Sequence, residues 1–153
     1  MNKKIKTDKD GTFESPVIYN DFWSPKVLDM LQEIIRRQFR GEIPAVIQYS
    51  IWPEDLWKDS GPILIIDLNN EKEIIESIKS ELNVIYDTSN LNYWYCGIHI
   101  FLKGAYIPTH DDKEHDFATT TYLNIDGWNA DWGGALLTMN KRGKMGVLFP
   151  EYN

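Results

Sequence analysis

The fold and chemistry of this chain are decided by YIPTHDD at residues 106–112, followed by TYLN at 121–124 and DWGG at 131–134. Within the first stretch, His110 and Asp112 lie two positions apart. Side chains alternate along an extended segment, so positions i and i+2 share one side. One imidazole and one carboxylate on the same side supply two of the three ligands of a 2-His-1-carboxylate iron site. The pair therefore predicts a metal site.

A His-x-Asp pair alone is a weak signal, and the alternative is an exposed histidine beside solvated carboxylates. The surrounding carboxylates are Asp111, Asp112, Glu114 and Asp116. The following sequence favours the metal site, because residues 117–124 alternate like a strand with one polar face and Gly133 and Gly134 allow a tight turn into another strand. A strand, a metal-binding turn and a returning strand are how a jelly-roll barrel builds a site at its mouth.

Composition excludes several classes of protein. The 153 residues carry a net charge of -7, which argues against non-specific nucleic-acid binding. The basic N-terminus leads into polar residues, so neither a signal peptide nor a membrane span is predicted. Cys96 is the only cysteine and lies in an apolar run, which predicts a buried, unreactive thiol and a reducing, cytoplasmic location.

Two helices are expected before the predicted metal site. Ser24 and Pro25 form a helix start and Gly41 a helix end, while Asn70 is the expected N-cap of a second helix with Glu73 at the capping-box position. Strands are expected at residues 43–51, 62–67, 93–102, 117–124, 134–139 and 145–149. This order predicts an α+β chain in which helices buttress a sheet.

Residues 101–153 resemble the prolyl-4-hydroxylase-like branch of the Fe(II)/2-oxoglutarate-dependent dioxygenases, in particular the small stand-alone enzymes of bacteria and phages. The matching motifs are FLKG at 101–104, PTHDD at 108–112, ATTTYLN at 118–124, Trp128, DWGG at 131–134 and FPEYN at 149–153. The resemblance implies a double-stranded β-helix (jelly-roll) core. Residues 1–92 would form its helix and strand support, and residues 93–153 the N-terminal portion of the core, in one incomplete domain.

The resemblance also implies an activity. A prolyl-4-hydroxylase-like enzyme uses Fe(II), 2-oxoglutarate as co-substrate and optionally ascorbate. It hydroxylates a C–H bond of a peptide or small molecule, such as a prolyl or other amino-acid side chain, and releases succinate and CO2. His110 and Asp112 match the first two iron ligands. Tyr122 matches a residue that contacts the 2-oxoglutarate carboxylate; the alternative is an aromatic side chain packed in the sheet. Leu136 matches a residue that forms an apolar wall of the co-substrate pocket; the alternative is an ordinary core leucine.

The sequence departs from the family pattern in one respect. The family has a distal histidine and then a basic residue that pairs with 2-oxoglutarate, and both would be expected after Asn153. Neither His99 nor His115 occupies the matching place; His99 is expected to be structural or to lie beside the ligands, and His115 to be exposed in a turn. The 153 residues are therefore not expected to turn over 2-oxoglutarate. The rival interpretation is a non-catalytic, truncated or degenerate barrel that acts as a binding module or has no activity.

A barrel that stops after its middle strands should expose apolar surface. The residues expected on that face are Ile98, Ile100, Leu102, Leu136 and Val147. The two predicted helices are not expected to cover it, because their apolar stripes must pack on the first strands. The chain alone is therefore expected to be insoluble or molten.

Overall fold

The computed structural model describes residues 19–43, 62–89, 94–108, 110, 117–123, 128–139, 143 and 145–149, together with the backbone of 46–47. The elements are α1 (Pro25–Phe39), β1 (Val46–Ile47), β2 (Ile63–Asp67), α3 (Lys72–Leu82), β3 (Gly97–Phe101), the 3-10 turn η1 (Ala130–Trp132), β4 (Leu136–Met139) and β5 (Met145–Leu148).

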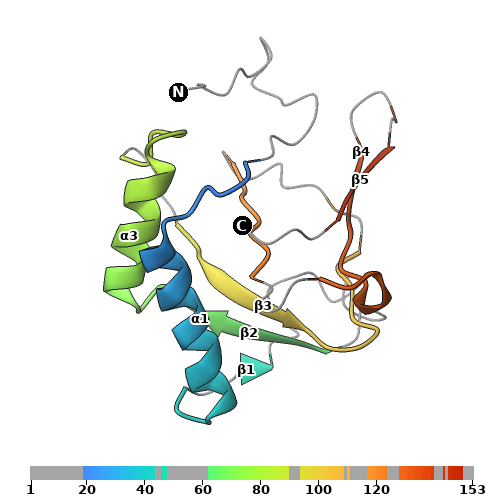
Figure 1. The fold of residues 1–153 in the computed structure, drawn as a ribbon, viewed down its shortest axis with the longest axis horizontal. Coiled ribbons are helices and arrows are strands. Elements are labelled where there is room, and N and C mark those ends of the chain that lie inside the picture. Colours follow the sequence, from blue (N-terminus) through green and yellow to red (C-terminus); the bar gives the residue numbers. More distant parts are fainter. Residues whose placement is uncertain are drawn as a thin grey trace.

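Two antiparallel sheets organise these elements. The first has the order β1-β2-β3, and the second is the hairpin β4-β5. Helices α1 and α3 lie together on one side of the three-stranded sheet, while the hairpin stands apart from both helices (Figure 1). β3 pairs with β2 along its whole length, from Ile63 opposite Phe101 to Asp67 opposite Gly97. The support region and the first strand of the predicted core therefore share one sheet.

Helix α1 begins and ends where the sequence predicts. The Ser24 side chain accepts a hydrogen bond from the Val27 amide at 3.4 Å, and Pro25 occupies the first turn. At the other end, Gly41 has φ 72°, a value that costs little only for glycine. The amides of Gly41 and Glu42 donate to the carbonyls of Gln38 and Arg37, each at 3.0 Å. This is the Schellman pattern, which satisfies the last carbonyls of a helix.

The start of the second helix differs from the prediction. α3 has Glu71 rather than Asn70 at its N-cap, and the Glu71 side chain makes no capping hydrogen bond. A turn precedes the helix: the Asp67 side chain accepts from the Asn69 amide at 2.8 Å, and the Glu71 amide donates to the Leu68 carbonyl at 2.8 Å. This turn moves the cap by one residue, so the predicted capping box with Glu73 does not form.

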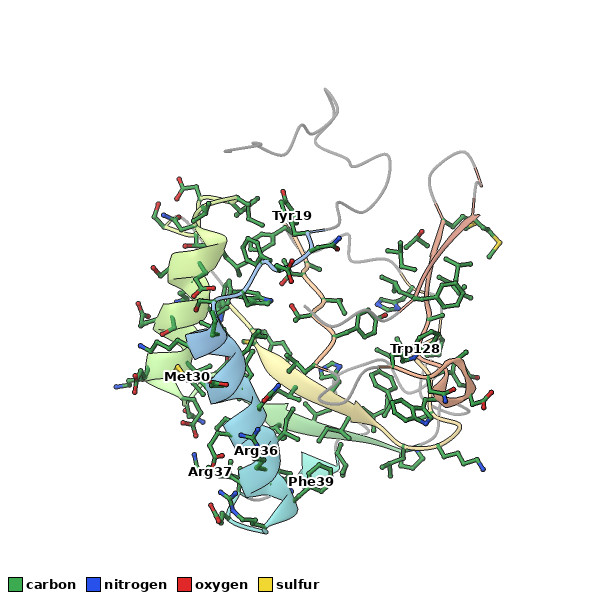
Figure 2. All side chains as sticks on the ribbon, in the orientation of Figure 1. Tyr19, Met30, Arg36, Arg37, Phe39 and Trp128 are labelled. Carbon is green, nitrogen blue, oxygen red and sulfur yellow. The ribbon has the colours of Figure 1, made fainter. Side chains whose placement is uncertain are left out.

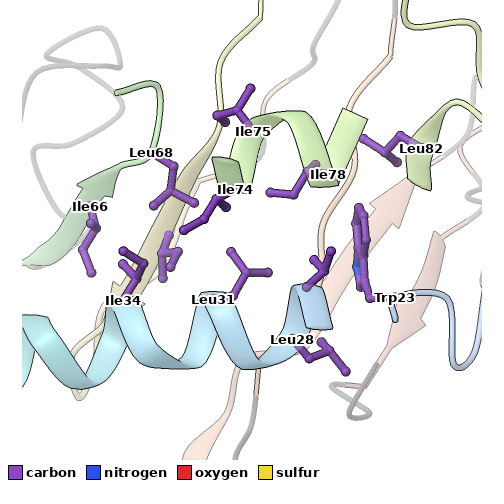
Figure 3. Packing of buried hydrophobic residues seen from close by; sticks show 12 residues of the cluster. Trp23, Leu28, Leu31, Ile34, Ile66, Leu68, Ile74, Ile75, Ile78 and Leu82 are labelled. Carbon is purple, nitrogen blue, oxygen red and sulfur yellow. The ribbon is translucent and has the colours of Figure 1, made fainter. Parts of the chain in front are cut away.

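The core forms on both faces of β2. Ile66 faces the helices and packs in a cluster with residues of α1 and α3, whereas Ile63 and Ile65 form a second cluster on the opposite face. The first cluster consists of Trp23, Val27, Leu28, Leu31, Ile34, Ile66, Leu68, Ile74, Ile75, Ile78, Leu82 and Ile98 (Figure 3). A strand covered on both faces needs a continuous apolar run rather than an alternating one, which explains ILII at residues 63–66.

Polar contacts join the ends of the two helices. The Ser24 amide donates to Glu81 Oε2 at 2.8 Å, and the Ser24 hydroxyl donates to the other oxygen of the same carboxylate. Glu81 lies in the last turn of α3, so its negative charge is placed at the N-terminus of α1, where the helix dipole favours an anion. This contact fixes the position of α1 along α3.

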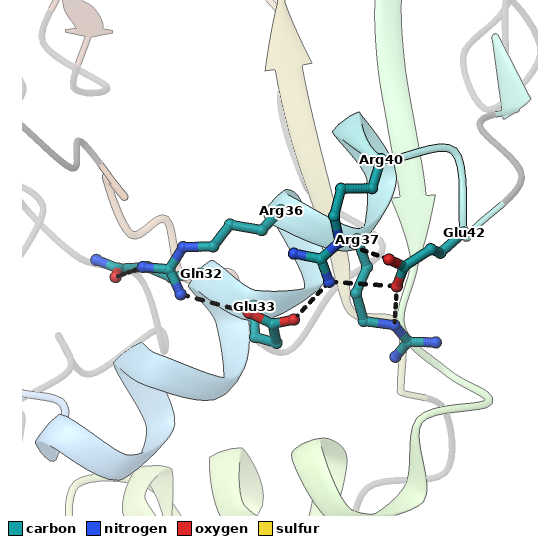
Figure 4. A network of polar contacts seen from close by, with 6 residues as sticks. All are labelled: Gln32, Glu33, Arg36, Arg37, Arg40 and Glu42. Atoms are coloured by element: carbon teal, nitrogen blue, oxygen red, sulfur yellow. Dashed lines mark hydrogen bonds and ion pairs between the residues drawn. The ribbon is translucent and has the colours of Figure 1, made fainter.

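The C-terminal half of α1 carries an exposed network of ion pairs (Figure 4). Arg40 bonds to Glu42 and lies 2.7 Å from Glu33, while Arg36 donates to Gln32 Oε1 at 3.1 Å. Hydrogen bonds from Arg40 lower the pKa of the Glu33 and Glu42 carboxyls, which therefore stay charged. Because the charged members are exposed and only Gln32 is buried, the ion pairs orient side chains more than they stabilise the fold.

A strand is predicted at residues 117–124, but the described part of this segment, residues 117–123, does not form one. Residues 117–123 belong to none of the described sheets. The alternation of sides is nevertheless present: Phe117 and Leu123 pack against the main cluster, and Thr121 accepts a hydrogen bond from Trp23 Nε1 at 2.8 Å. Side-chain contacts thus hold this segment against the helical layer without a ladder of backbone hydrogen bonds.

The prediction of an uncovered apolar face is wrong for Ile98 and Ile100. Ile98 is buried and Ile100 half-buried, and both pack in the cluster that contains the two helices. Leu102 and Leu136 are exposed as predicted, at 44% and 37%, and further exposed apolar side chains gather on one face of the hairpin. Leu137 and Val147 are paired there with 61% and 50% of their surfaces exposed, and Met139 and Met145 with 64% and 65%. Among the described residues, no helix has both the length and the apolar character needed to cross a bilayer.

Removing side-chain volume from the main cluster should destabilise the chain. Leu82 is 2% exposed, so we expect Leu82→Ala to lower the free energy of unfolding by about 3 kcal/mol. The matched control is Phe39→Ala on α1, whose side chain is 72% exposed and which should change stability by less than about 0.5 kcal/mol. Urea denaturation followed by circular dichroism measures both. Equal losses would contradict the assignment of the core.

The apolar hairpin face should limit solubility. We expect the double variant Leu137→Thr/Val147→Thr to raise the concentration at which the chain begins to aggregate, because threonine keeps the β preference and removes apolar surface. Light scattering against concentration measures this threshold. Val84→Thr is the control, since Val84 is 65% exposed and lies outside the hairpin. An unchanged threshold in the double variant would show that another surface drives association.

Candidate metal and co-substrate site

The segment that carries His110 leaves β3 through a tight turn. Gly104 has φ 84°, and the Ala105 amide donates to the Leu102 carbonyl at 2.9 Å. Ala105 and Ile107 then pack against the cluster of Ile63 and Ile65, on the sheet face opposite the helices. The sheet therefore holds the start of the predicted metal loop, and His110 follows on the exposed surface.

The imidazole of His110 is oriented by the backbone. Its Nδ1 lies 2.8 Å from the carbonyl oxygen of Pro108. A carbonyl oxygen only accepts hydrogen bonds, so Nδ1 carries a proton and donates, and in the neutral imidazole the lone pair then lies on Nε2. This is the arrangement found in metal-ligating histidines, where the second ring nitrogen donates to a carbonyl or carboxylate. In its neutral form, His110 therefore has the tautomer that could bind a metal through Nε2.

The predicted second ligand, Asp112, lies outside the described residues, as do Asp111 and His115. No group of three or more His, Cys, Asp or Glu side chains able to hold a metal occurs in the part of the chain that is described. The fit of Fe(II) is therefore judged on His110, whose tautomer suits it, and on the donor types of the pair, since imidazole and carboxylate together suit Fe(II).

Tyr122 points away from the helical core. Its neighbours Thr121 and Leu123 contact Trp23 and the main cluster, so alternation directs Tyr122 to the opposite side. There its hydroxyl donates a hydrogen bond to the carbonyl of Gly134 at 3.0 Å. Partial burial raises the pKa of Tyr122, so the hydroxyl keeps its proton at neutral pH. The predicted co-substrate residue is thus a neutral donor beside the start of β4.

Leu136 begins β4 two residues after Gly134 and is paired with Leu148 of β5. Its side chain is 37% exposed. An apolar wall of a ligand pocket needs a side chain that is accessible but held by a strand, and Leu136 meets both conditions. The structure therefore brings the Tyr122 hydroxyl close to the segment that carries Leu136, whereas none of the described contacts joins His110 to either residue.

Trp128, for which the sequence predicts no role in the site, has two contacts in this region. Its indole Nε1 donates to the Gly133 carbonyl at 2.7 Å, and its ring lies against Phe149 with centroids 5.5 Å apart. Trp128 lies at the base of the β4–β5 hairpin (Figure 2). The spacing of a tryptophan five residues before a Gly-Gly pair was the available signal, but spacing alone does not identify the acceptor of the indole proton.

His99 and Cys96 lie near β3 in partly buried surroundings. His99 pairs with Ile65 across the sheet, on the opposite side from Ile98, and burial lowers its pKa below the usual 6.5. A neutral, half-buried imidazole fits the predicted structural role. Burial and the nearby Asp67 raise the pKa of Cys96 to about 11, so this thiol stays protonated and is a poor nucleophile, as expected.

Two surface depressions of about 370 and 390 Å³ lie between α1 and α3 and include none of His110, Tyr122 and Leu136. No family model, curated protein or solved structure matches this chain. The jelly-roll fold and the dioxygenase activity therefore remain predictions from the sequence motifs.

The half-buried His99 should make stability depend on pH. Its pKa is lowered in the folded state, so below about pH 6.5 the unfolded chain takes up a proton that the folded chain resists, and stability falls as the pH falls. We expect His99→Gln to reduce the loss of stability between pH 7.5 and 5.5, measured as the urea midpoint. An equal loss in the variant and the parent chain would exclude His99 as the cause.

Proposed function

We propose that this chain carries part of an Fe(II)/2-oxoglutarate-dependent dioxygenase site of the prolyl-4-hydroxylase type. His110 and Asp112 are its first two metal ligands, Tyr122 contacts a carboxylate of 2-oxoglutarate, and Leu136 forms an apolar wall. The observation that carries the proposal is the hydrogen bond from His110 Nδ1 to the Pro108 carbonyl, which in the neutral imidazole leaves the lone pair on Nε2.

Each residue has a defined part in this proposal. The Pro108 carbonyl holds the imidazole of His110 in the ligating tautomer, and the sheet contacts of Ala105 and Ile107 fix the chain that leads to it. Tyr122 remains protonated and supplies a neutral donor for an anionic oxygen. Leu136 limits water around the co-substrate. When bound, Fe(II) with 2-oxoglutarate and O2 supplies the oxidation of a substrate C–H bond, with release of succinate and CO2.

The proposed substrate class follows by analogy from the family resemblance. A prolyl or other amino-acid side chain, in a peptide or as a small molecule, is the type of substrate that this branch hydroxylates. The fold itself does not select a substrate, since one scaffold hosts many chemistries. The metal ligands are therefore the part of the proposal that is tested first.

Metal binding distinguishes the two predicted ligands from the residue between them. We expect His110→Ala and Asp112→Ala each to weaken Mn(II) binding by at least about tenfold, measured by electron paramagnetic resonance of free Mn(II). Asp111→Ala should weaken it less than about threefold, because only positions i and i+2 share the metal-facing side. Mn(II) is used because it occupies the same ligand types without oxidising.

The control for non-specific binding of Mn(II) to surface carboxylates is Glu73→Ala, since Glu73 is an exposed carboxylate on α3. Equal weakening by Asp111→Ala and Asp112→Ala would show that the extended register is wrong and that the acidic cluster binds Mn(II) non-specifically. Binding that is unaffected by His110→Ala would remove the proposed site.

A further inference from the structure

The hairpin β4–β5 is attached to the neighbouring segment through one turn. Gly133 and Gly134 have φ 72° and 86°, a left-handed conformation that glycine adopts without strain. Such a pair is also the most flexible dipeptide of a chain, so its conformation must be fixed by contacts with other residues. Two side chains supply these contacts, and both donate to its carbonyls: Trp128 to Gly133 and Tyr122 to Gly134.

These two donors differ in what else they contact. Trp128 belongs to the turn itself, where the Asn129 side chain accepts from the Asp131 amide at 2.9 Å and the Trp132 amide donates to the Asn129 carbonyl at 2.9 Å. Its ring also touches Phe149, directly after β5. Trp128 therefore contacts the chain just before β4 and just after β5. Tyr122 comes from the separate segment 117–123, which is held against the helical core.

The Tyr122 hydroxyl has only one proton to donate. In the structure that proton is directed to the Gly134 carbonyl at 3.0 Å. Donation to a carboxylate of 2-oxoglutarate therefore requires the proton to turn away from Gly134. If Tyr122 alone held the glycine pair, this exchange would release the turn. The bond from Trp128 to Gly133, at 2.7 Å, is independent of it and can hold the turn throughout.

We infer that Trp128 is a positioning residue: its indole N–H fixes the Gly133–Gly134 turn, so that the Tyr122 hydroxyl stays beside the start of β4 and can transfer its hydrogen bond from Gly134 to a bound carboxylate. The fixed turn also determines where Leu136 stands. The transfer of the hydrogen bond to a bound carboxylate rests on the proposed function. The coupling between Trp128 and Tyr122, by which a change at one residue alters the surroundings of the other, does not.

The first experiment measures this coupling by fluorine NMR on the full chain. The six tryptophans are labelled with 5-fluorotryptophan and assigned by single Trp→Phe changes. We expect Tyr122→Phe to shift the Trp128 resonance and Tyr106→Phe to leave it unchanged, since Tyr106 is 49% exposed. With fluorotyrosine label, Trp128→Phe should shift the Tyr122 resonance. Trp132→Phe, in the same turn but 67% exposed, should not.

Trp128→Phe keeps an aromatic ring against Phe149 and removes only the N–H donor, so the hairpin should still fold. Circular dichroism checks this. Loss of stability in Trp128→Phe without a change in the Tyr122 resonance would overturn the inference, because it would reveal a packing role alone. A Tyr122 resonance that responds equally to Trp128→Phe and Trp132→Phe would overturn it as well.

The second experiment adds 2-oxoglutarate with Mn(II) and follows the Tyr122 resonance. We expect a saturable shift in the parent chain and binding that is weaker by about three- to tenfold in Trp128→Phe, the effect of one misplaced hydrogen bond. Unchanged binding in Trp128→Phe would overturn the positioning role. No shift in the parent chain, with the tryptophan–tyrosine coupling intact, would count against the proposed function and leave the coupling established.

Discussion

The burial of β2 on both faces is the constraint on which the rest of the structure depends. Ile66 faces α1 and α3, and Ile63 and Ile65 face the other way. A sheet strand with apolar side chains on both faces is stable only if each face is covered. The two helices cover one face, and the segment after β3 begins to cover the other with Ala105 and Ile107. The path of residues 105–107, which lead toward His110, thus follows from the need to bury the second face.

Beyond this core and the β4–β5 ladder, three side-chain hydrogen bonds link residues that the structure describes. Trp23 bonds to Thr121, Tyr122 to Gly134, and Trp128 to Gly133. These contacts form a series that leads from the N-terminus of α1, across segment 117–123, to the start of β4. Two of the three use indole donors, whose large rings also pack against neighbours and so restrict the direction of the N–H. The abundance of tryptophan in this sequence therefore serves connection as well as burial.

The candidate site combines features that were predictable with features that were not. The i, i+2 spacing of His110 and Asp112 and the alternation around Tyr122 could be read from the sequence, because both depend on the period of an extended chain. The tautomer of His110 could not, since it depends on where the Pro108 carbonyl points. The acceptors of the Tyr122 and Trp128 protons were likewise unpredictable, because each bond joins residues whose separation depends on the path of the turn.

The sequence by itself determined several local elements of this protein, although not the N-cap of α3. Ser24 and Pro25 begin α1, Gly41 ends it, and the Gly133–Gly134 pair precedes β4, because caps and left-handed residues act over a few positions. Only the tertiary structure decided which face of each element is covered. Ile98 was expected on an open face and is instead buried under the helices, and residues 117–123 alternate as predicted but pair with no described strand. Burial and strand pairing depend on partners distant in the chain, and periodicity shows that a face is apolar without showing what covers it.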